Sequence, residues 1–137
     1  MTSPIKPELS GVYFPPTEIE PLRAEAMEAG IAWFDVNLAG VAGKREFLAA
    51  CARSLRFPKS FGRNWDALAD CLKDLYADSV VNFRDAATFA EAAPDDCATA
   101  LEIFQDAASY WKERGSTFVA LVDAAPEGAT LRRLRAR

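Results

Sequence analysis

The sequence has 137 residues, half of them hydrophobic, and its 16 basic and 20 acidic residues give a formal net charge of −4. This length suffices for one globular domain that buries about 68% of its unfolded surface. The absence of histidine from the sequence argues against imidazole-assisted hydrolysis and leaves carboxylates, lysine or a bound metal for any catalysis. Without a long apolar run or a signal peptide, the chain is expected to be cytoplasmic and to have no membrane contact.

The basic residues and the cysteines give no sign of a nucleic-acid ligand, a metal site or a cofactor. Lysine and arginine are not interleaved with aromatic residues, as phosphate contacts would require. The arginine-rich end, residues 125–137, is interpreted as a solvated basic tail rather than an arm that binds nucleic acid. Cys51, Cys71 and Cys97 match no disulfide or zinc spacing, so we expect buried free thiols.

The predicted elements of the first part of the chain begin with a proline-rich extension, residues 1–30. Within it, residues 11–14 are predicted as an edge strand and residues 18–29 as a short helix. The extension either adds this strand and helix to the fold or modifies the choice of partner, and the sequence leaves both open. Residues 31–38, IAWFDVNL, are β-rich and are predicted as a well-buried strand.

The rest of the chain continues to alternate between helices and strands. An amphipathic helix is predicted before Pro58, an acidic helix after Asn64, a strand over 79–83, a long helix that ends at Gly115 and a strand over 117–122. The segment between the strand over 79–83 and the long helix has no clear form. The tryptophans are expected in the core: Trp33, Trp65 and Trp111. Apolar strands separated by helices indicate an α/β fold with a parallel sheet covered by helices.

The acidic helix lies within the segment FPKSFGRNWDALADCLKDL, residues 57–75. Helical spacing gathers its apolar residues on one face: Trp65, Leu68, Leu72, Leu75 and Tyr76. The opposite side carries a stripe of carboxylates: Asp66, Asp70, Asp74 and Asp78. Like charges at this spacing destabilise an isolated helix by about 0.2 to 0.5 kcal/mol per pair. Of these acids, Asp66 is helped by the helix dipole, because it follows a predicted Asn64 cap.

Two interpretations of the stripe remain open, a solvated face and an interface for a cationic partner. Gly62 in the preceding loop can adopt a positive φ and hold the chain close to a partner. Cations that would neutralise the stripe are scarce, with Arg63 and Lys73 alone nearby. A negative surface of this kind suits a cationic partner.

The segment resembles the signature of the barstar family, the intracellular protein inhibitors of small secreted ribonucleases. The matching positions are Phe61, Gly62, Asn64, Trp65, Asp66, Ala67, Leu68, Asp70, Cys71 and Leu72. The resemblance extends more weakly over residues 31–124 and implies a barstar-like α/β fold, a small three-stranded parallel sheet packed with helices. Residues 1–30 and 125–137 lie outside this barstar-like domain, within one globular unit.

The resemblance also implies a binding mode in which the acidic helix and its loop block the active site of a basic ribonuclease. Asp70 would enter the phosphate-binding pocket and pair with the arginines and histidine of the enzyme. Asp66 would be a flanking contact, Asp106 matches an acid on the neighbouring helix, and Asn64 and Gly62 would supply loop contacts. A rigidly presented carboxylate can occupy the donors that hold a phosphate. The chain alone would be a monomer without enzymatic activity.

The chain departs from the family at positions that carry aromatic residues in its best-known member. Those positions are Ser60, Ala69 and Leu75 here. Ser60, Ala69 and Asp74 complete the predicted partner-binding surface. Because aromatic residues are frequent interface anchors, either the target differs from the barnase type or the complex is weaker.

Two other functions are compatible with the acidic helix. The first is an immunity protein that uses the same acidic face against a toxin of other chemistry. The second is an enzyme in which Asp66 and Asp70 hold Mg²⁺ for phosphoryl chemistry. The sequence supports the enzyme least, because no nucleophile or third ligand of clear type lies near these residues.

Overall fold

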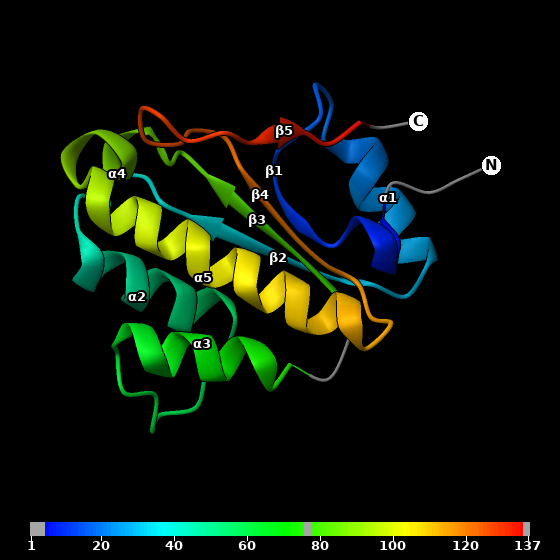
Figure 1. Ribbon diagram of the computed structural model, residues 1–137, viewed down its shortest axis with the longest axis horizontal. Helices are drawn as coiled ribbons and strands as arrows, with labels where there is room; N and C mark the ends of the chain where they lie inside the picture. Colours follow the sequence, from blue (N-terminus) through cyan, green and yellow to red (C-terminus); the bar gives the residue numbers. More distant parts are fainter. Residues whose placement is uncertain (1–4, 76–77, 136–137) are drawn as a thin grey trace.

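The computed structural model describes residues 5–75 and 78–135 (Figure 1). Its elements in chain order are η1 (Pro7–Leu9), β1 (Gly11–Phe14), α1 (Glu20–Glu28), β2 (Ala32–Asn37), α2 (Lys44–Ser54), α3 (Trp65–Lys73), β3 (Ser79–Arg84), α4 (Ala87–Ala92), α5 (Pro94–Glu113), β4 (Phe118–Val122) and β5 (Arg132–Arg133). The predicted helices and strands are all present, and the segment of unclear form contains α4. Tyr76 and the last two residues of the basic tail lie outside the described residues.

The sheet is parallel throughout, with the strand order β2-β3-β4-β1-β5. The α/β class and the parallel sheet are confirmed, but the sheet has five strands rather than three. Strand β1 of the extension pairs with β4, and β5 of the basic tail pairs with β1. The prediction that residues 11–14 form an edge strand is therefore wrong, because strands flank β1 on both sides.

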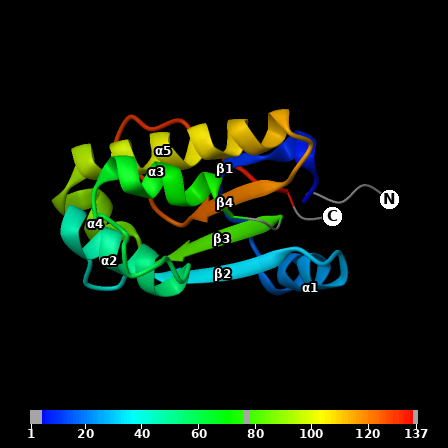
Figure 2. The ribbon, with the colours of Figure 1, turned by 90° about the horizontal axis from the view of Figure 1, so that it is seen from below.

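Helices cover both faces of this sheet (Figure 2). On one face, Val81 and Phe83 pack in a large cluster with residues of α2, α3, α4 and α5. On the other face, Val80 and Leu121 pack with Leu22 and Ala26 of α1. This division arises because alternate residues of a strand point to opposite faces. The helix that covers the second face, α1, belongs to the extension.

Strand β2 forms the outer edge of the sheet, at the bottom of the view in Figure 2. The prediction that this strand is well buried is wrong. Val36 is the only buried residue of the strand, whereas Asp35 and Asn37 are exposed. An edge strand has a neighbour on one side alone, and α1 covers only part of its outer surface.

The basic tail is folded onto the sheet in part. Leu134 is buried in the cluster that includes α1, and the guanidinium of Arg133 donates a hydrogen bond to the Pro15 carbonyl at 2.6 Å. The arginines Arg132, Arg133 and Arg135 are exposed. The expectation of a solvated tail is thus wrong for Leu134, because this apolar side chain fills the space between the sheet and the extension.

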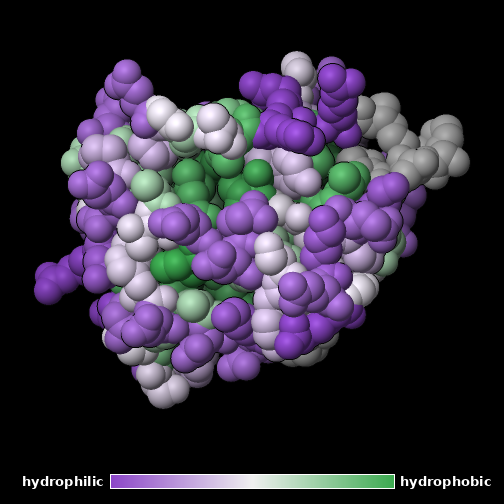
Figure 3. Space-filling model, in the orientation of Figure 1, coloured by the Kyte–Doolittle hydropathy of each residue, from purple (hydrophilic) through white to green (hydrophobic). Residues whose placement is uncertain are grey.

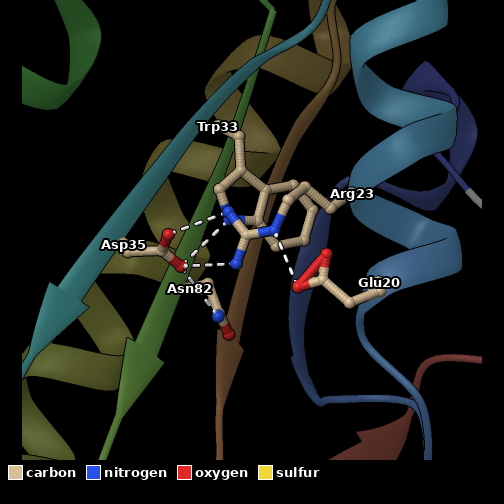
Figure 4. Close-up of polar contacts among 5 residues, drawn as sticks. All are labelled: Glu20, Arg23, Trp33, Asp35 and Asn82. Atoms are coloured by element: carbon tan, nitrogen blue, oxygen red, sulfur yellow. Dashed lines mark hydrogen bonds and ion pairs between the residues drawn. The ribbon is translucent and has the colours of Figure 1, made fainter.

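A polar cluster joins α1 to the exposed face of β2 (Figure 4). The Arg23 guanidinium donates to both carboxylate oxygens of Asp35, at 2.9 and 3.4 Å, and lies 4.8 Å from the centroid of the Trp33 ring. Trp33 and Asn82 also donate to Asp35, at 3.0 and 3.1 Å. Trp33 is therefore a half-buried partner of Arg23 rather than a fully buried core residue.

The same cluster lowers the pKa of the Asp35 carboxyl. Partial burial acts to raise this pKa, but hydrogen bonds from Arg23, Trp33 and Asn82 and the positive charge of Arg23 outweigh it and bring the pKa to about 2. The ordinary value is 3.8. The folded state therefore binds the ionised form of Asp35 more favourably than the unfolded state does.

The cysteines are free, as expected, and Cys51 and Cys97 are buried. The prediction of a buried thiol is wrong for Cys71, which is half-buried. Burial raises the pKa of the Cys51 thiol well above its usual range and that of Cys97 to about 11. Within the described part of the chain, no helix is both long and apolar enough to cross a membrane.

We expect Leu134→Ala to lower the free energy of unfolding by about 2 kcal/mol or more, because it removes a buried side chain that joins the tail to α1 and the sheet. Urea unfolding followed by tryptophan fluorescence measures this change. Arg135→Ala, at the exposed neighbouring position, is the control and should shift the free energy by less than about 0.5 kcal/mol. Equal effects of the two substitutions would show that the tail contributes nothing through Leu134.

The lowered pKa of Asp35 predicts acid-sensitive stability. A depressed folded-state pKa gives stability that is present above the unfolded pKa near 3.8 and is lost as the pH falls toward 2. Urea unfolding at several pH values between 5 and 2.5 should show a steeper loss for the natural chain than for Asp35→Asn, which cannot ionise there. Parallel pH profiles for the two proteins would contradict this linkage.

Candidate functional site

The loop before the acidic helix starts from a well-defined helix end. Arg56 has a φ of 56°, and the Phe57 N–H donates to the Ala52 carbonyl at 3.0 Å. This is the bond pattern of a Schellman motif, in which a left-handed residue follows the last turn of the helix. The end of α2 thereby sets the direction in which residues 57–64 leave the core.

Two aromatic side chains then hold this loop in place. The ring centroids of Phe57 and Phe61 are 5.0 Å apart, and both rings pack against the main core. The Phe61 N–H donates to the Pro58 carbonyl at 2.9 Å and closes a turn. Ser60, which precedes Phe61 in the sequence, is exposed, as are Lys59 and Arg63.

The predicted cap of the acidic helix is confirmed. Asn64 has extended backbone angles, and its Oδ1 accepts a hydrogen bond from the Ala67 N–H at 2.7 Å. Gly62 does not use the positive φ that glycine permits; its neighbour Arg63 takes the left-handed conformation, with a φ of 52°. A Cβ atom at Gly62 would lie 3.2 Å from Nδ2 of Asn64, so a larger residue here would crowd the capping side chain.

Helix α3 is attached to its neighbours at both ends. Leu68 and Leu72 are fully buried on its inner face, as the spacing predicts. At the first turn, the Trp65 ring lies 6.1 Å from the Phe47 ring of α2. At the last turn, the indole N–H of Trp111 in α5 donates to the Leu72 carbonyl at 2.9 Å. Because both ends are tied down, the outer face of α3 has a fixed orientation.

The outer face carries Asp66 and Asp70, both exposed, and Asp74 is the exposed C-cap residue. Within residues 5–75 and 78–135, the carboxylates of these three residues make no hydrogen bond or ion pair. The two ion pairs recorded in those ranges both involve Arg23. Among the described residues, the acids of α3 therefore have no cationic partner, as the scarcity of nearby basic residues predicts.

The stripe is shorter than the sequence pattern indicates. Asp78 lies beyond the end of α3, and its carboxylate accepts a hydrogen bond from the Thr117 N–H at 3.1 Å. The placement of Asp78 in the stripe is wrong, because the helix ends at Lys73.

The acids also affect a neighbouring cysteine. Burial raises the pKa of the Cys71 thiol, and the charges of Asp74 and Asp70 add to this effect.

Asp106 lies on α5, which runs beside α3 (Figure 1). Its side chain is exposed and is one helical turn from Tyr110, whose ring lies 5.5 Å from Nζ of Lys73 in α3. Residues four apart share one side of a helix, so Asp106 lies on the side of α5 that borders α3. The structure thus brings Asp106 to the same surface as Asp66 and Asp70.

The three positions noted above for their lack of aromatic residues give part of this surface small side chains. Ala69 is half-buried and Ser60 is exposed, whereas Leu75 packs against the core. Sequence reasoning did not single out Tyr110, whose ring is also 3.6 Å from the Arg114 guanidinium. Its spacing of four from Asp106 is the signal that could have identified it.

Two grooves flank these elements. One, of about 650 Å³, lies between β2 and the ends of α2 and α3 and is lined in part by Asp74. The other, of about 520 Å³, lies between α5 and residues 126–131, where apolar side chains gather in a hollow of the surface (Figure 3). The second groove contains none of the predicted site residues. Across the described ranges, no group of three or more Cys, Asp or Glu residues is arranged to hold a metal ion.

Comparison with known proteins identifies the family of the chain. The chain matches no curated protein. The family model described as barstar, the barnase inhibitor, matches residues 31–123, which include the loop, α3 and α5. Because this match covers more than half of the sequence, the chain belongs to the barstar family.

Proposed function

We propose that the chain inhibits a small basic ribonuclease by placing α3 and the loop over residues 57–64 in the active site of the enzyme. The observation that carries this proposal is the outer face of α3, where Asp66 and Asp70 are exposed and make no ion pair with the described residues. Membership of a family of barnase inhibitors supports the same function.

The chemistry of the target explains why carboxylates suit this role. A ribonuclease holds the phosphate of its substrate with fixed cationic donors, and a carboxylate can accept the same charge-assisted hydrogen bonds. Asp70, in the middle of α3, is the residue that enters the phosphate site. Asp66 and Asp106 flank it, and Gly62 and Asn64 present the loop. The chain thus acts as a substrate mimic and not as an enzyme.

Rigidity of α3 is part of the proposal. Binding loses affinity when a surface must be ordered first, so a preorganised helix retains more of its interaction energy. The buried residues Leu68 and Leu72 and the Trp111 bond hold the helix before the partner arrives. The acids are therefore presented at fixed positions, at the expense of mutual repulsion that a cationic partner relieves.

A second candidate is an immunity protein against a toxin of other chemistry. It is favoured by the small side chains of Ser60 and Ala69, which leave the surface around Asp70 without large aromatic contacts. A partner with another shape would then fill the space that these side chains leave. The acidic face and its cationic partner are common to both candidates.

We expect Asp70→Ala to weaken inhibition by at least about 30-fold, because truncating one member of a buried charge pair typically costs 2 kcal/mol or more. The measurement is the inhibition constant for RNA cleavage against a panel of purified barnase-type ribonucleases. Glu28→Ala, which removes an exposed acid of α1 on the opposite face of the sheet, is the control and should change inhibition less than threefold, roughly the effect of a rim charge. If Asp70→Ala inhibits as well as the natural chain, the proposed binding mode is wrong.

We also expect Asn64→Ala to lower the free energy of unfolding by about 1 kcal/mol and to weaken inhibition, because it removes the cap that orders the first turn of α3. Asn64→Asp retains a capping oxygen and is the matched control. Chemical unfolding and the same RNA cleavage assay report the two effects. Equal behaviour of the two variants would mean that the cap does not position the acids.

A further inference from the structure

The two edges of the sheet differ in how they are protected from another strand. At one edge, β5 has two residues, both exposed arginines. Short, charged strands discourage edge-to-edge pairing. At the other edge, β2 has six residues, and Asp35, its one charged residue, is neutralised by Arg23. The edge at β2 is thus long and without the usual protection.

The direction of the hydrogen bonds identifies which groups of β2 face outward. The Ala32 N–H donates to the Asp78 carbonyl and the Leu38 N–H to the Arg84 carbonyl, both at 2.8 Å. Backbone groups alternate along a parallel strand, so the even-numbered residues bond to β3. The N–H and C=O groups of Trp33, Asp35 and Asn37 face the open edge, and none of them has a hydrogen-bond partner among the described residues.

The groove of about 650 Å³ opens beside the first half of this edge. Apolar side chains line it from three elements: Phe34 of β2, Leu55 and Phe57 at the end of α2, and Leu75 after α3. Asp74 and Arg56 are charged residues of its lining. The groove is continuous with the acidic surface, because Asp74 caps the helix that carries Asp66 and Asp70.

We propose that the β2 edge and this groove bind an extended segment of the cationic protein that α3 binds, which adds to the sheet as a further strand. This inference rests on the proposed function and adds a second contact to it. The outward groups of Trp33 and Asp35 would pair with the backbone of that segment, as in other cases of strand addition. Alternate side chains of the segment would enter the apolar groove.

The negative charge of the chain favours a cationic segment over a second copy of the chain as the occupant of this edge. The chain has a net charge of −4, and a second copy at the β2 edge would bring another acidic helix toward Asp74. A cationic segment brings the opposite charge to the same carboxylate, which makes no ion pair with the described residues. The recognised segment is therefore extended, and its side chains on the face that enters the groove include a lysine or arginine for Asp74 beside the apolar ones.

Amide hydrogen exchange measured by NMR tests this contact directly. The ¹⁵N-labelled chain is compared alone and in complex with the ribonuclease that it inhibits most strongly in the RNA cleavage assay. The amides of Trp33 and Asp35 should exchange at least tenfold more slowly in the complex. The amides of Phe34 and Val36 are internal controls, because they already bond to β3 and are protected in both states.

A matched pair of variants tests the backbone contribution to affinity. Trp33→Pro and Trp33→Val both remove the indole ring, but only proline removes the outward N–H, which an edge strand tolerates. Trp33→Pro should bind about three- to tenfold more weakly than Trp33→Val, the range expected for one net hydrogen bond. Circular dichroism establishes that both variants remain folded.

The outcomes separate this inference from the proposed function. Inhibition that depends on Asp70 while the Trp33 and Asp35 amides stay unprotected would overturn the strand contact and leave the function in place. Protection of these amides in a complex that Asp70→Ala does not weaken would support the strand contact and refute the role of α3. If these amides are protected in the isolated chain, and dilution removes both the protection and a dimer of the chain, the edge binds a second copy instead. The absence of inhibition across the panel would overturn both.

Discussion

The attachment of α3 to the core is the interaction on which the acidic surface depends. Leu68 and Leu72 are fully buried, and the indole of Trp111 donates to the Leu72 carbonyl from the neighbouring helix. With its inner face fixed in this way, the helix cannot turn its aspartates toward internal cations. The repulsion between Asp66 and Asp70 is a small cost compared with the burial of two leucines, each of which contributes about 1.5 to 3 kcal/mol.

The additions outside the family region complete the sheet without covering this surface. Strand β1 pairs with β4, β5 pairs with β1, and α1 covers the opposite face. The link between Arg23 and Asp35 joins that helix to β2. The extension and the tail therefore close one edge and one face of the sheet, and the edge at β2 stays open beside the acidic helix.

Local sequence signals predicted the features of the site that depend on neighbouring residues. The Asn64 cap, the inner face of α3 and the exposure of Asp66 and Asp70 follow from helical spacing and capping chemistry. Features that depend on the backbone path were predicted less well. Arg63 rather than Gly62 has the positive φ, whereas Gly62 packs closely against the side chain of Asn64. Asp78 does not belong to the stripe, because α3 ends five residues earlier. The Asp78 carboxylate instead accepts a hydrogen bond from the Thr117 amide.

By itself, the sequence determined the α/β class, the helices and strands, the family and the acids of α3, because each depends on local periodicity or on a contiguous motif. Only the tertiary structure decided that β1 lies inside the sheet, that Leu134 is buried, and that Arg23 pairs with Asp35. These features join residues far apart in the chain, and no local pattern encodes which strand edge or helix face a distant segment will meet.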